Sequence, residues 1–236
     1  MASVWITGAG TGIGRAMALA FAQAGDVVTL SGRRPEPLGD LANEIMAAGG
    51  HARVAPVDVL DRDAVTAVAD SLVAETGRLD VLCNNAGINI PARHWDTIDW
   101  PRWDAVLDIN VKGALNAIAA ALPAMRAQGD GVIVNTASWA GRFYSTVSGV
   151  AYGASKHALM SINASLNAEE GKHGIRACAL CPAEVNTPLL ANRPDYDEEV
   201  GQAAIQPEDL AAAALYVARA PARIAVHEIV IAPVRR

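Results

Sequence analysis

The sequence predicts an α/β domain in which a parallel sheet is covered by helices on both faces. Short apolar runs rich in β-branched residues alternate with longer Ala-rich helical patterns, an alternation typical of βαβ units. Near-continuous apolar runs such as Val132-Ile133-Val134 indicate strands buried on both faces. The length of 236 residues suits one sizeable core better than two small ones, so residues 1–236 are expected to form a single domain.

Strands and helices follow one another along the chain. The predicted strands are Ser3–Thr7, Val27–Ser31, Ala52–Val57, Val81–Asn84, Gly131–Thr136, Ile175–Leu180 and Glu228–Ile231. The predicted helices are Gly12–Ala24, Pro37–Ala48, Arg62–Glu75, Trp100–Arg126, Val150–His173 and Pro207–Ala218. Prolines at 35, 37, 101 and 207 stand where helices can begin, since a missing N–H costs little in the first turn. The stretch Leu189–Gln206 has no regular pattern; its acids indicate a solvated surface, and a mobile flap over a pocket is the alternative.

A glycine-rich turn joins the first strand to the first helix, with the sequence Thr7-Gly8-Ala9-Gly10-Thr11-Gly12-Ile13-Gly14. Glycine lets the backbone turn tightly and approach a pyrophosphate, and the helix that follows offers N–H groups and a positive dipole end to that anion. A purely structural turn would need only one or two glycines. The turn therefore predicts a dinucleotide site.

The second and third strands end in residues that bear on the choice of cofactor. An NAD site usually has an acid about 20 residues after the glycine turn, but here Gly32 is followed by Arg33 and Arg34. A guanidinium pairs with a 2′-phosphate, which an acid would repel; NADP(H) is therefore favoured, and NAD(H) is the alternative. Asp58, after the third strand, could accept a hydrogen bond from the adenine amino group or cap the next helix.

Three groups of residues after the fourth and fifth strands suggest chemistry. The small residues of Asn84-Asn85-Ala86-Gly87 allow the backbone to pass close to a cofactor, and the Asn84 amide can tie neighbouring strands together. Asn110 is an amide in mid-helix, which usually has a specific partner or points to solvent. Ser138 projects from the carboxyl end of a strand, where doubly wound sheets bind ligands.

Tyr152 and Lys156 lie four residues apart in a helical pattern, which puts them on one face, about 6 Å apart along the axis. An ammonium beside a phenol favours the phenolate and lowers the tyrosine pKa from about 10. A tyrosine tuned in this way can donate a proton to a carbonyl oxygen or accept one from an alcohol.

Composition and charge narrow the class of protein. Apolar residues make up 52% and charged residues 19% of the chain, which excludes a disordered chain. The net charge of −6 with no basic stripe argues against nucleic acid. The N-terminus lacks a signal-peptide pattern, and no apolar run approaches the roughly 20 residues of a membrane span, so a cytoplasmic protein is expected. Cys178 and Cys181 form a C-x-x-C inside an apparent buried strand, for which packing is favoured over redox or metal chemistry. No metal site is expected.

Together these motifs resemble the short single-domain branch of the short-chain dehydrogenase/reductase family. The resemblance covers nearly the whole chain. It depends on finding, in order, the glycine turn, Asp58, Asn84–Gly87, Asn110, Ser138, Tyr152 with Lys156, and Pro182–Thr187. It implies a Rossmann-like, doubly wound sheet of seven parallel strands in the order 3-2-1-4-5-6-7, and a homodimer or homotetramer.

The resemblance also implies roles for individual residues. Tyr152 is expected to be the general acid/base, Lys156 to hold the nicotinamide ribose and Ser138 to polarise the substrate oxygen. Asn110 is expected to position a water in a proton relay to Lys156, and Thr187 to contact the carboxamide. The expected cofactor-binding residues are Gly8, Gly10, Thr11, Gly12, Ile13, Gly14, Arg33, Arg34, Asp58, Val59, Asn85, Ala86, Gly87, Tyr152, Lys156, Pro182, Val185 and Thr187.

The substrate side is less sharply defined, and two departures from the family pattern bear on it. Ala183 replaces the usual glycine, and the ending Glu-Ile-Val-Ile-Ala-Pro is similar to that of reductases acting on small hydroxy acids or amino-acid alcohols. The candidate substrate residues are His94, Ser138, Trp139, Phe143, Tyr144 and Glu184, with Trp95 and Arg142 nearby. Arg142 could bind a substrate carboxylate, although a surface role is favoured for it, and His94 suits an ordinary loop position better than a second acid.

The sequence therefore predicts an NADP(H)-dependent oxidoreductase that interconverts a small alcohol, with a hydroxy acid as one option, and its ketone or aldehyde. The alternatives are an NAD-dependent dehydrogenase of the same family and a dinucleotide-binding regulator that has lost catalysis. The expected partner of the predicted oxidoreductase is a small-molecule carbonyl or alcohol. A regulator would have no physical need for Lys156 beside Tyr152, so the enzyme is favoured.

Overall fold

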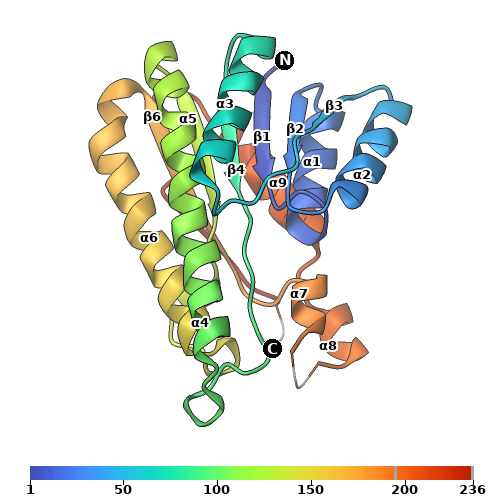
Figure 1. Ribbon diagram of the computed structural model, residues 1–236, viewed down its shortest axis with the longest axis vertical. Coiled ribbons are helices and arrows are strands. Elements are labelled where there is room, and N and C mark those ends of the chain that lie inside the picture. The colour runs from blue at the N-terminus through green and yellow to red at the C-terminus, as the bar shows by residue number, and fades with distance from the viewer. Residues whose placement is uncertain (194–195, 235–236) are drawn as a thin grey trace.

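A computed structural model describes residues 1–193 and 196–234 (Figure 1). These residues form a parallel sheet in the order β3-β2-β1-β4-β5-β6-β7, which confirms the predicted Rossmann-like topology. The strands are β1 (Ser3–Thr7), β2 (Val27–Ser31), β3 (His51–Val54), β4 (Val81–Asn84), β5 (Gly131–Thr136), β6 (Ile175–Pro182) and β7 (Glu228–Ile231).

Helices cover both faces of this sheet because alternate side chains of each strand point to opposite sides. Val4 and Ile6 of β1 lie in a core shared with α1, α2 and α9, whereas Trp5 between them lies in a core shared with α3, α5 and α6. The helices are α1 (Gly12–Gln23), α2 (Pro35–Ala47), α3 (Arg62–Thr76), α4 (Trp100–Leu107), α5 (Ala114–Gln128), α6 (Val150–Glu170), α7 (Pro188–Ala191), α8 (Glu198–Ala203) and α9 (Pro207–Arg219).

Element boundaries differ from the sequence prediction by up to three residues, and two of the differences lie beside prolines. The third strand ends at Val54 rather than Val57, and Pro56, whose ring fixes φ at about −65°, lies just beyond its end. The backbone N–H groups of Ala55 and Val57, on either side of Pro56, still donate to the carbonyl oxygens of Leu30 and Gly32. The second helix begins at Pro35 instead of Pro37, because proline is favoured at the first helical position.

The predicted helix Trp100–Arg126 is interrupted. A π-helical turn, Asp108–Gly113, separates α4 from α5, and it contains Asn110. Such turns are rare and often mark functional positions. A π-helical turn contains one more residue than an α-helical turn. The periodicity of the sequence does not reveal this residue, because the apolar pattern continues on both sides of the turn.

The same segment qualifies the expectation about membrane spans. By length and composition alone, Trp100–Gln128 could cross a membrane, and 44% of its most apolar window is buried in the fold. Ala117, Ala121 and Met125 of this segment face the core shared with α3.

The predicted irregular stretch Leu189–Gln206 contains the short helices α7 and α8. Glu198 and Glu199 are exposed, which agrees with a solvated acidic surface. Pro194 and Asp195 lie outside the described residues. Arg193 approaches Glu184 at the end of β6, with 3.7 Å between Nη1 and Oε1.

The two cysteines of the C-x-x-C motif point to opposite faces of β6. Cys178 belongs to the core shared with α1, and Cys181 packs with Leu159 of α6. Burial raises the pKa of Cys178 to about 12 and that of Cys181 to about 11, so neither thiol is activated. This placement favours packing over redox chemistry. Among the described residues, no group of three or more His, Cys, Asp or Glu is arranged to hold a metal ion.

Candidate active site

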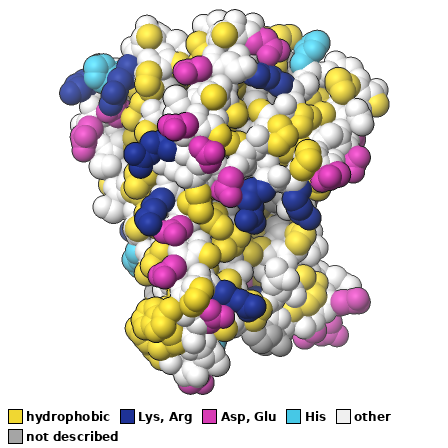
Figure 2. Space-filling view, viewed as in Figure 1, with side chains coloured by type: hydrophobic (Ala, Val, Ile, Leu, Met, Phe, Trp, Pro, Cys, Tyr) yellow, Lys and Arg dark blue, Asp and Glu magenta, His cyan; other side chains and the backbone are white. Residues whose placement is uncertain are grey.

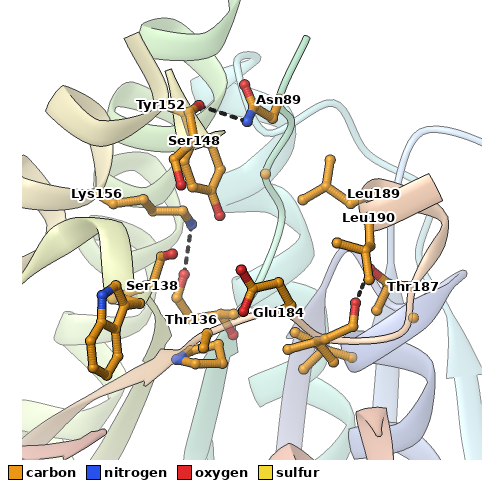
Figure 3. Close-up of a pocket in the computed structure, with 18 of the residues that line it drawn as sticks. Asn89, Thr136, Ser138, Ser148, Tyr152, Lys156, Glu184, Thr187, Leu189 and Leu190 are labelled. Atoms are coloured by element: carbon orange, nitrogen blue, oxygen red, sulfur yellow. Dashed lines mark hydrogen bonds between the residues drawn. The ribbon is translucent and has the colours of Figure 1, made fainter. Parts of the chain in front are cut away.

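A cavity of about 600 Å³ lies at the carboxyl ends of the strands, where doubly wound sheets bind their ligands. Figure 3 shows the Tyr152 hydroxyl and the Lys156 ammonium pointing into it, with Thr187, Leu189 and Leu190 on the opposite wall. The sequence-predicted residues that line it are Gly8, Thr11, Gly12, Ile13, Asn85, Ala86, Gly87, Ser138, Trp139, Tyr144, Tyr152, Lys156, Pro182, Glu184, Val185 and Thr187.

The glycine turn is built so tightly that side chains would not fit in it. A Cβ on Gly14 would lie 2.3 Å from the Gly8 carbonyl oxygen, far inside van der Waals contact. Gly8 and Gly12 have φ values of +65° and +54°, a region that favours glycine. A Cβ on Gly12 would lie 3.1 Å from Thr187 Cγ2 across the cavity. The turn thus leaves backbone bordering the cavity at the N-terminus of α1, an arrangement that fits the pyrophosphate of a dinucleotide.

Hydrogen bonds attach this turn to the end of β4. The Thr7 hydroxyl accepts from the backbone N–H groups of Asn85 and Ala86, at 3.0 and 3.1 Å. The Asn85 amide donates back to the carbonyls of Thr7 and Gly8. Asn85, Ala86 and the turn therefore form one rigid wall of the cavity.

Tyr152 lies at the start of α6, with its phenol in the cavity. Burial raises the pKa of Tyr152 above its usual 10, while a hydrogen bond with Ser138 and the charge of Arg93 act to lower it. The sequence led us to expect a Tyr152 pKa lowered by Lys156. The Lys156 Nζ lies 5.4 Å from the Tyr152 ring centroid but is not among the groups that shift this pKa. The difference arises because burial outweighs the nearby charges.

Lys156 is 4% exposed, and its Nζ donates to the Thr136 carbonyl oxygen at 2.7 Å. Burial lowers the pKa of Lys156 to about 8, since a low-dielectric environment disfavours the ammonium. Ser138, which follows β5, accepts a hydrogen bond from the Ala140 N–H. Tyr152, Lys156 and Ser138 therefore meet at the end of β5, as the motif predicted.

Asn110 lies just behind this group, 1% exposed. Its Oδ1 accepts from the Ile88 N–H at 2.8 Å, and its Nδ2 donates to the Ile88 carbonyl and to Ser155 Oγ, both at 3.0 Å. The side chain therefore anchors the segment after β4 to α6. A Cβ on Gly87 would lie 3.2 Å from Asn110 Oδ1 and 3.6 Å from Lys156 Nζ, so glycine at this position keeps the space between the two residues open.

Buried asparagine side chains form a chain of hydrogen bonds across the strands and helix that carry the site. Asn84 Nδ2 donates to Asn135 Oδ1, Asn135 Nδ2 donates to Asn163 Oδ1, and Asn163 Nδ2 donates to the His227 carbonyl. The predicted tie between neighbouring strands through Asn84 is thus present, and it extends through α6 to the segment before β7.

Several candidate residues lie away from the cavity. His94 caps the 3₁₀ helix Trp95–Thr97, and Phe143 stacks on Trp139 with centroids 4.4 Å apart. Arg142 Nε lies 2.8 Å from Glu228 Oε1, as a surface role would require. None of these three is among the described residues that line the cavity.

The candidate residues for the adenosine end also lie outside this cavity. Arg33 and Arg34 are exposed after β2. Asp58 Oδ1 accepts from the Leu60 N–H, while Asp61 caps α3. Val59 is buried, and a Cβ on Gly113 would lie 2.5 Å from its Cγ2.

The sequence analysis missed several residues that line the cavity. They are Asn89, Arg93, Thr136, Ala137, Ser145, Thr146, Val147, Ser148, Ala183, Pro188, Leu189, Leu190 and Arg193. Many lie in loops or in very short helices, where the sequence has no periodic pattern. Position relative to the motifs offered the one usable signal, since Arg93 follows Asn84–Gly87 by a few residues and directly precedes the chosen His94.

Comparison with known proteins places this geometry in a family. The model for "short chain dehydrogenase" matches residues 2–198. An uncharacterized oxidoreductase of Staphylococcus aureus is 34% identical over 230 residues, which span 97% of this chain and 96% of the relative.

Solved structures agree with the sequence matches. A metagenomic short-chain oxidoreductase in complex with NADP is 31% identical, with a TM-score of 0.85 over 100% of this chain and 98% of its own. A 3-ketoacyl-(acyl-carrier-protein) reductase from Brucella melitensis, complexed with NADH, is 27% identical, with a TM-score of 0.87 over 98% of this chain and 96% of its own.

Proposed function

We propose a reaction for this chain, which belongs to the short-chain dehydrogenase family and is an oxidoreductase that acts on CH–OH and C=O groups with a nicotinamide dinucleotide. The protein interconverts a small alcohol and its ketone or aldehyde with NADP(H), and Tyr152 is the general acid/base. The observation that carries the proposal is the convergence of Tyr152, Ser138 and Lys156 on a cavity that also borders the glycine turn.

When bound, the nicotinamide supplies or accepts a hydride. The residues of this chain then have separate tasks. The Tyr152 hydroxyl protonates the carbonyl oxygen in reduction and takes the proton back in oxidation. Ser138 hydrogen-bonds the same oxygen and orients it beside the phenol. Lys156, held by the Thr136 carbonyl, keeps a positive charge near the Tyr152 ring. Asn110 holds the backbone of Ile88, in the segment after β4, beside these groups.

The proposal is tested by mixing the protein with NADPH and a panel of ketones and aldehydes while NADPH absorbance is followed. Steady consumption that depends on the carbonyl supports a reductase. Tight binding of NADPH without turnover on the panel, in either direction, would instead support the dinucleotide-binding regulator.

Carbonyl reduction is expected to weaken at alkaline pH. Lys156, with a pKa of about 8, is charged below that pH and neutral above it, and the pKa of Tyr152 lies higher still. The kcat/KM for reduction, which reports groups of the free enzyme, should therefore be level from pH 6 to about 8 and fall above it. These assignments are contradicted if kcat/KM stays level up to pH 10, or if it decreases as the pH is lowered from 7.

We also infer a preference for NADP(H), with Arg33 and Arg34 as the residues that bind the 2′-phosphate. Arg33→Ala is expected to raise KM for NADPH about 10- to 100-fold, since a charge-assisted hydrogen bond contributes roughly 1.5–3 kcal/mol. KM for NADH should stay the same. Arg223→Ala, an exposed arginine elsewhere, is the control. A clear NADH preference that Arg33→Ala leaves unchanged would refute the assignment and favour the NAD-dependent alternative.

We further infer a cytoplasmic homodimer or homotetramer. Exposed Leu107 and Leu115 lie at the ends of the helical segments that flank the π-helical turn, and burying them against a second copy would remove apolar surface from water. Sedimentation velocity distinguishes the monomer from these assemblies.

A further inference from the structure

Arg93 is a buried guanidinium in the wall of the active-site cavity, and the mechanism proposed above gives it no task. The side chain is 3% exposed, and it lines the cavity together with Tyr152 and Ser138. Arginine is rarely this buried unless it interacts with an anion or with several acceptors. Backbone carbonyls accept from this guanidinium, and its place in the cavity wall brings its positive charge beside Tyr152 and Ser138.

The local structure holds this guanidinium in one place. Its Nε donates to the Ile90 carbonyl at 2.7 Å, and its Nη1 donates to the Val147 carbonyl at 3.1 Å. One acceptor lies in the loop after β4 and the other just before α6. The guanidinium plane is therefore fixed before any substrate arrives.

The backbone around Arg93 is fixed as well. The Arg93 carbonyl accepts from the Val150 N–H at 3.0 Å, two residues before Tyr152. A Cβ on Gly149 would lie 2.4 Å from Arg93 Cβ, so the chain can pass this close only with glycine there.

An aromatic cluster supports the loop from outside. Trp103 Nε1 donates to the Ala92 carbonyl at 2.8 Å, and the rings of Trp95 and Trp100 pack on Trp103. Figure 2 shows apolar side chains gathered at the lower left of the molecule, over the loop that precedes α4. This cluster makes the loop that carries Arg93 part of the rigid scaffold.

The charges around the cavity favour an anion. Its described lining contains three cations, Arg93, Lys156 and Arg193, and one carboxylate, Glu184. Glu184 lies against Arg193, and Lys156 is held at the end of β5 by Thr136. The charge of Arg93 also acts on the Tyr152 phenol, which places the guanidinium within electrostatic reach of the reacting oxygen.

We propose that Arg93 binds a carboxylate of the substrate, so that the preferred substrates are small hydroxy acids and the corresponding oxo acids. The positive charge of a guanidinium held in one place at the cavity wall attracts a carboxylate there. The carboxylate takes no part in bond making. It is held while the carbonyl carbon gains a hydride and the carbonyl oxygen gains the Tyr152 proton. The inference rests on the proposed function for the reaction itself, and it adds the substrate class.

The first test compares each oxo acid with its neutral ester, using acetoacetate with methyl acetoacetate and pyruvate with methyl pyruvate. The protein is expected to show a kcat/KM at least 10-fold higher for at least one acid than for its ester. Arg93→Gln, which removes the charge and keeps polar contacts, should lower kcat/KM for that acid about 10- to 100-fold. The ester should change less than 3-fold.

Arg142→Gln is the matched comparison, because Arg142 is a second arginine near the site that pairs with Glu228 outside the cavity. It should leave the ratio of acid to ester unchanged. The inference is overturned if Arg142→Gln abolishes the acid preference and Arg93→Gln does not. It is also overturned if Arg93→Gln slows acid and ester equally, since that result means a role in folding or in tuning Tyr152.

A binding measurement keeps the inference testable if Arg93→Gln does not fold. Calorimetry with the Tyr152→Phe protein and NADP⁺, in which oxidation of the ligand is slow, compares 3-hydroxybutyrate with its methyl ester, and lactate with methyl lactate. At least 10-fold tighter binding of an acid is expected, and equal binding in both pairs overturns the inference. Reduction of neutral carbonyls without acid preference contradicts this inference alone, whereas failure to consume NADPH with any carbonyl contradicts the proposed function.

Discussion

Tyr152→Phe is expected to lower kcat for carbonyl reduction by about 10²- to 10⁴-fold, the range that a positioned general acid contributes. Phenylalanine keeps the ring but removes the proton that the substrate oxygen receives. The burial that raises the Tyr152 pKa keeps the phenol protonated at neutral pH, which suits an acid in the direction of reduction. The measurement is single-turnover reduction with saturating NADPH.

Tyr216→Phe is the matched control, because Tyr216 is 61% exposed on α9 and is not among the residues that line the cavity. It should leave kcat unchanged. Dissociation constants for NADPH should be similar in both variants and the unmodified protein. Activity of Tyr152→Phe within 10-fold of the unmodified protein would refute the assigned role, since another group would then supply the proton.

Gly14→Ala is expected to raise the dissociation constant for NADPH at least 10-fold and to lower the melting temperature by several degrees. Its Cβ would lie 2.3 Å from the Gly8 carbonyl oxygen and 2.6 Å from Asn85 Nδ2, so the turn has to move away from the end of β4. Overpacking of this kind costs about 1–3 kcal/mol. Fluorescence titration with NADPH and a thermal melt measure the two effects.

The control for this prediction is Gly39→Ala in α2, where the added methyl group meets no atom within 4 Å. Alanine is a better helix former than glycine by about 1 kcal/mol, so this variant should be slightly more stable and should bind NADPH normally. If Gly14→Ala behaves like Gly39→Ala, the turn does not hold the cofactor as we infer.

The alternation of strands and helices and the central residues of the site could be predicted because local patterns carry them, whereas the order of the strands was implied by the family resemblance. The glycine turn, Ser138, and the pair Tyr152 and Lys156 each follow or begin a regular element, and the structure brings them to one cavity. The π-helical turn at Asn110 could not be predicted, because the helical pattern of apolar residues continues on both sides of the turn and does not show where the extra residue lies.

Tertiary packing decides the features that the sequence left open. Whether His94 or Arg93 enters the cavity depends on how one loop crosses the start of α6, and Gly149 and Val150 set that crossing. The Tyr152 pKa likewise depends on burial, which a spacing of four residues does not reveal. Arg142 and Arg93 are indistinguishable as arginines near the motifs, and only their contacts separate a surface ion pair from a cavity wall.

In the proposed reaction, a hydride passes between NADP(H) and a carbonyl carbon while Tyr152 supplies the proton. Reduction with NADPH that carries deuterium at the transferred position of C4, followed by mass spectrometry of the product, follows both partners of this transfer. The expected product is an alcohol with one deuterium on the carbinol carbon, formed in equal amount to the NADPH consumed, and almost no labelled alcohol is expected with Tyr152→Phe. Unlabelled alcohol, or NADPH loss without alcohol, would contradict the proposed reaction.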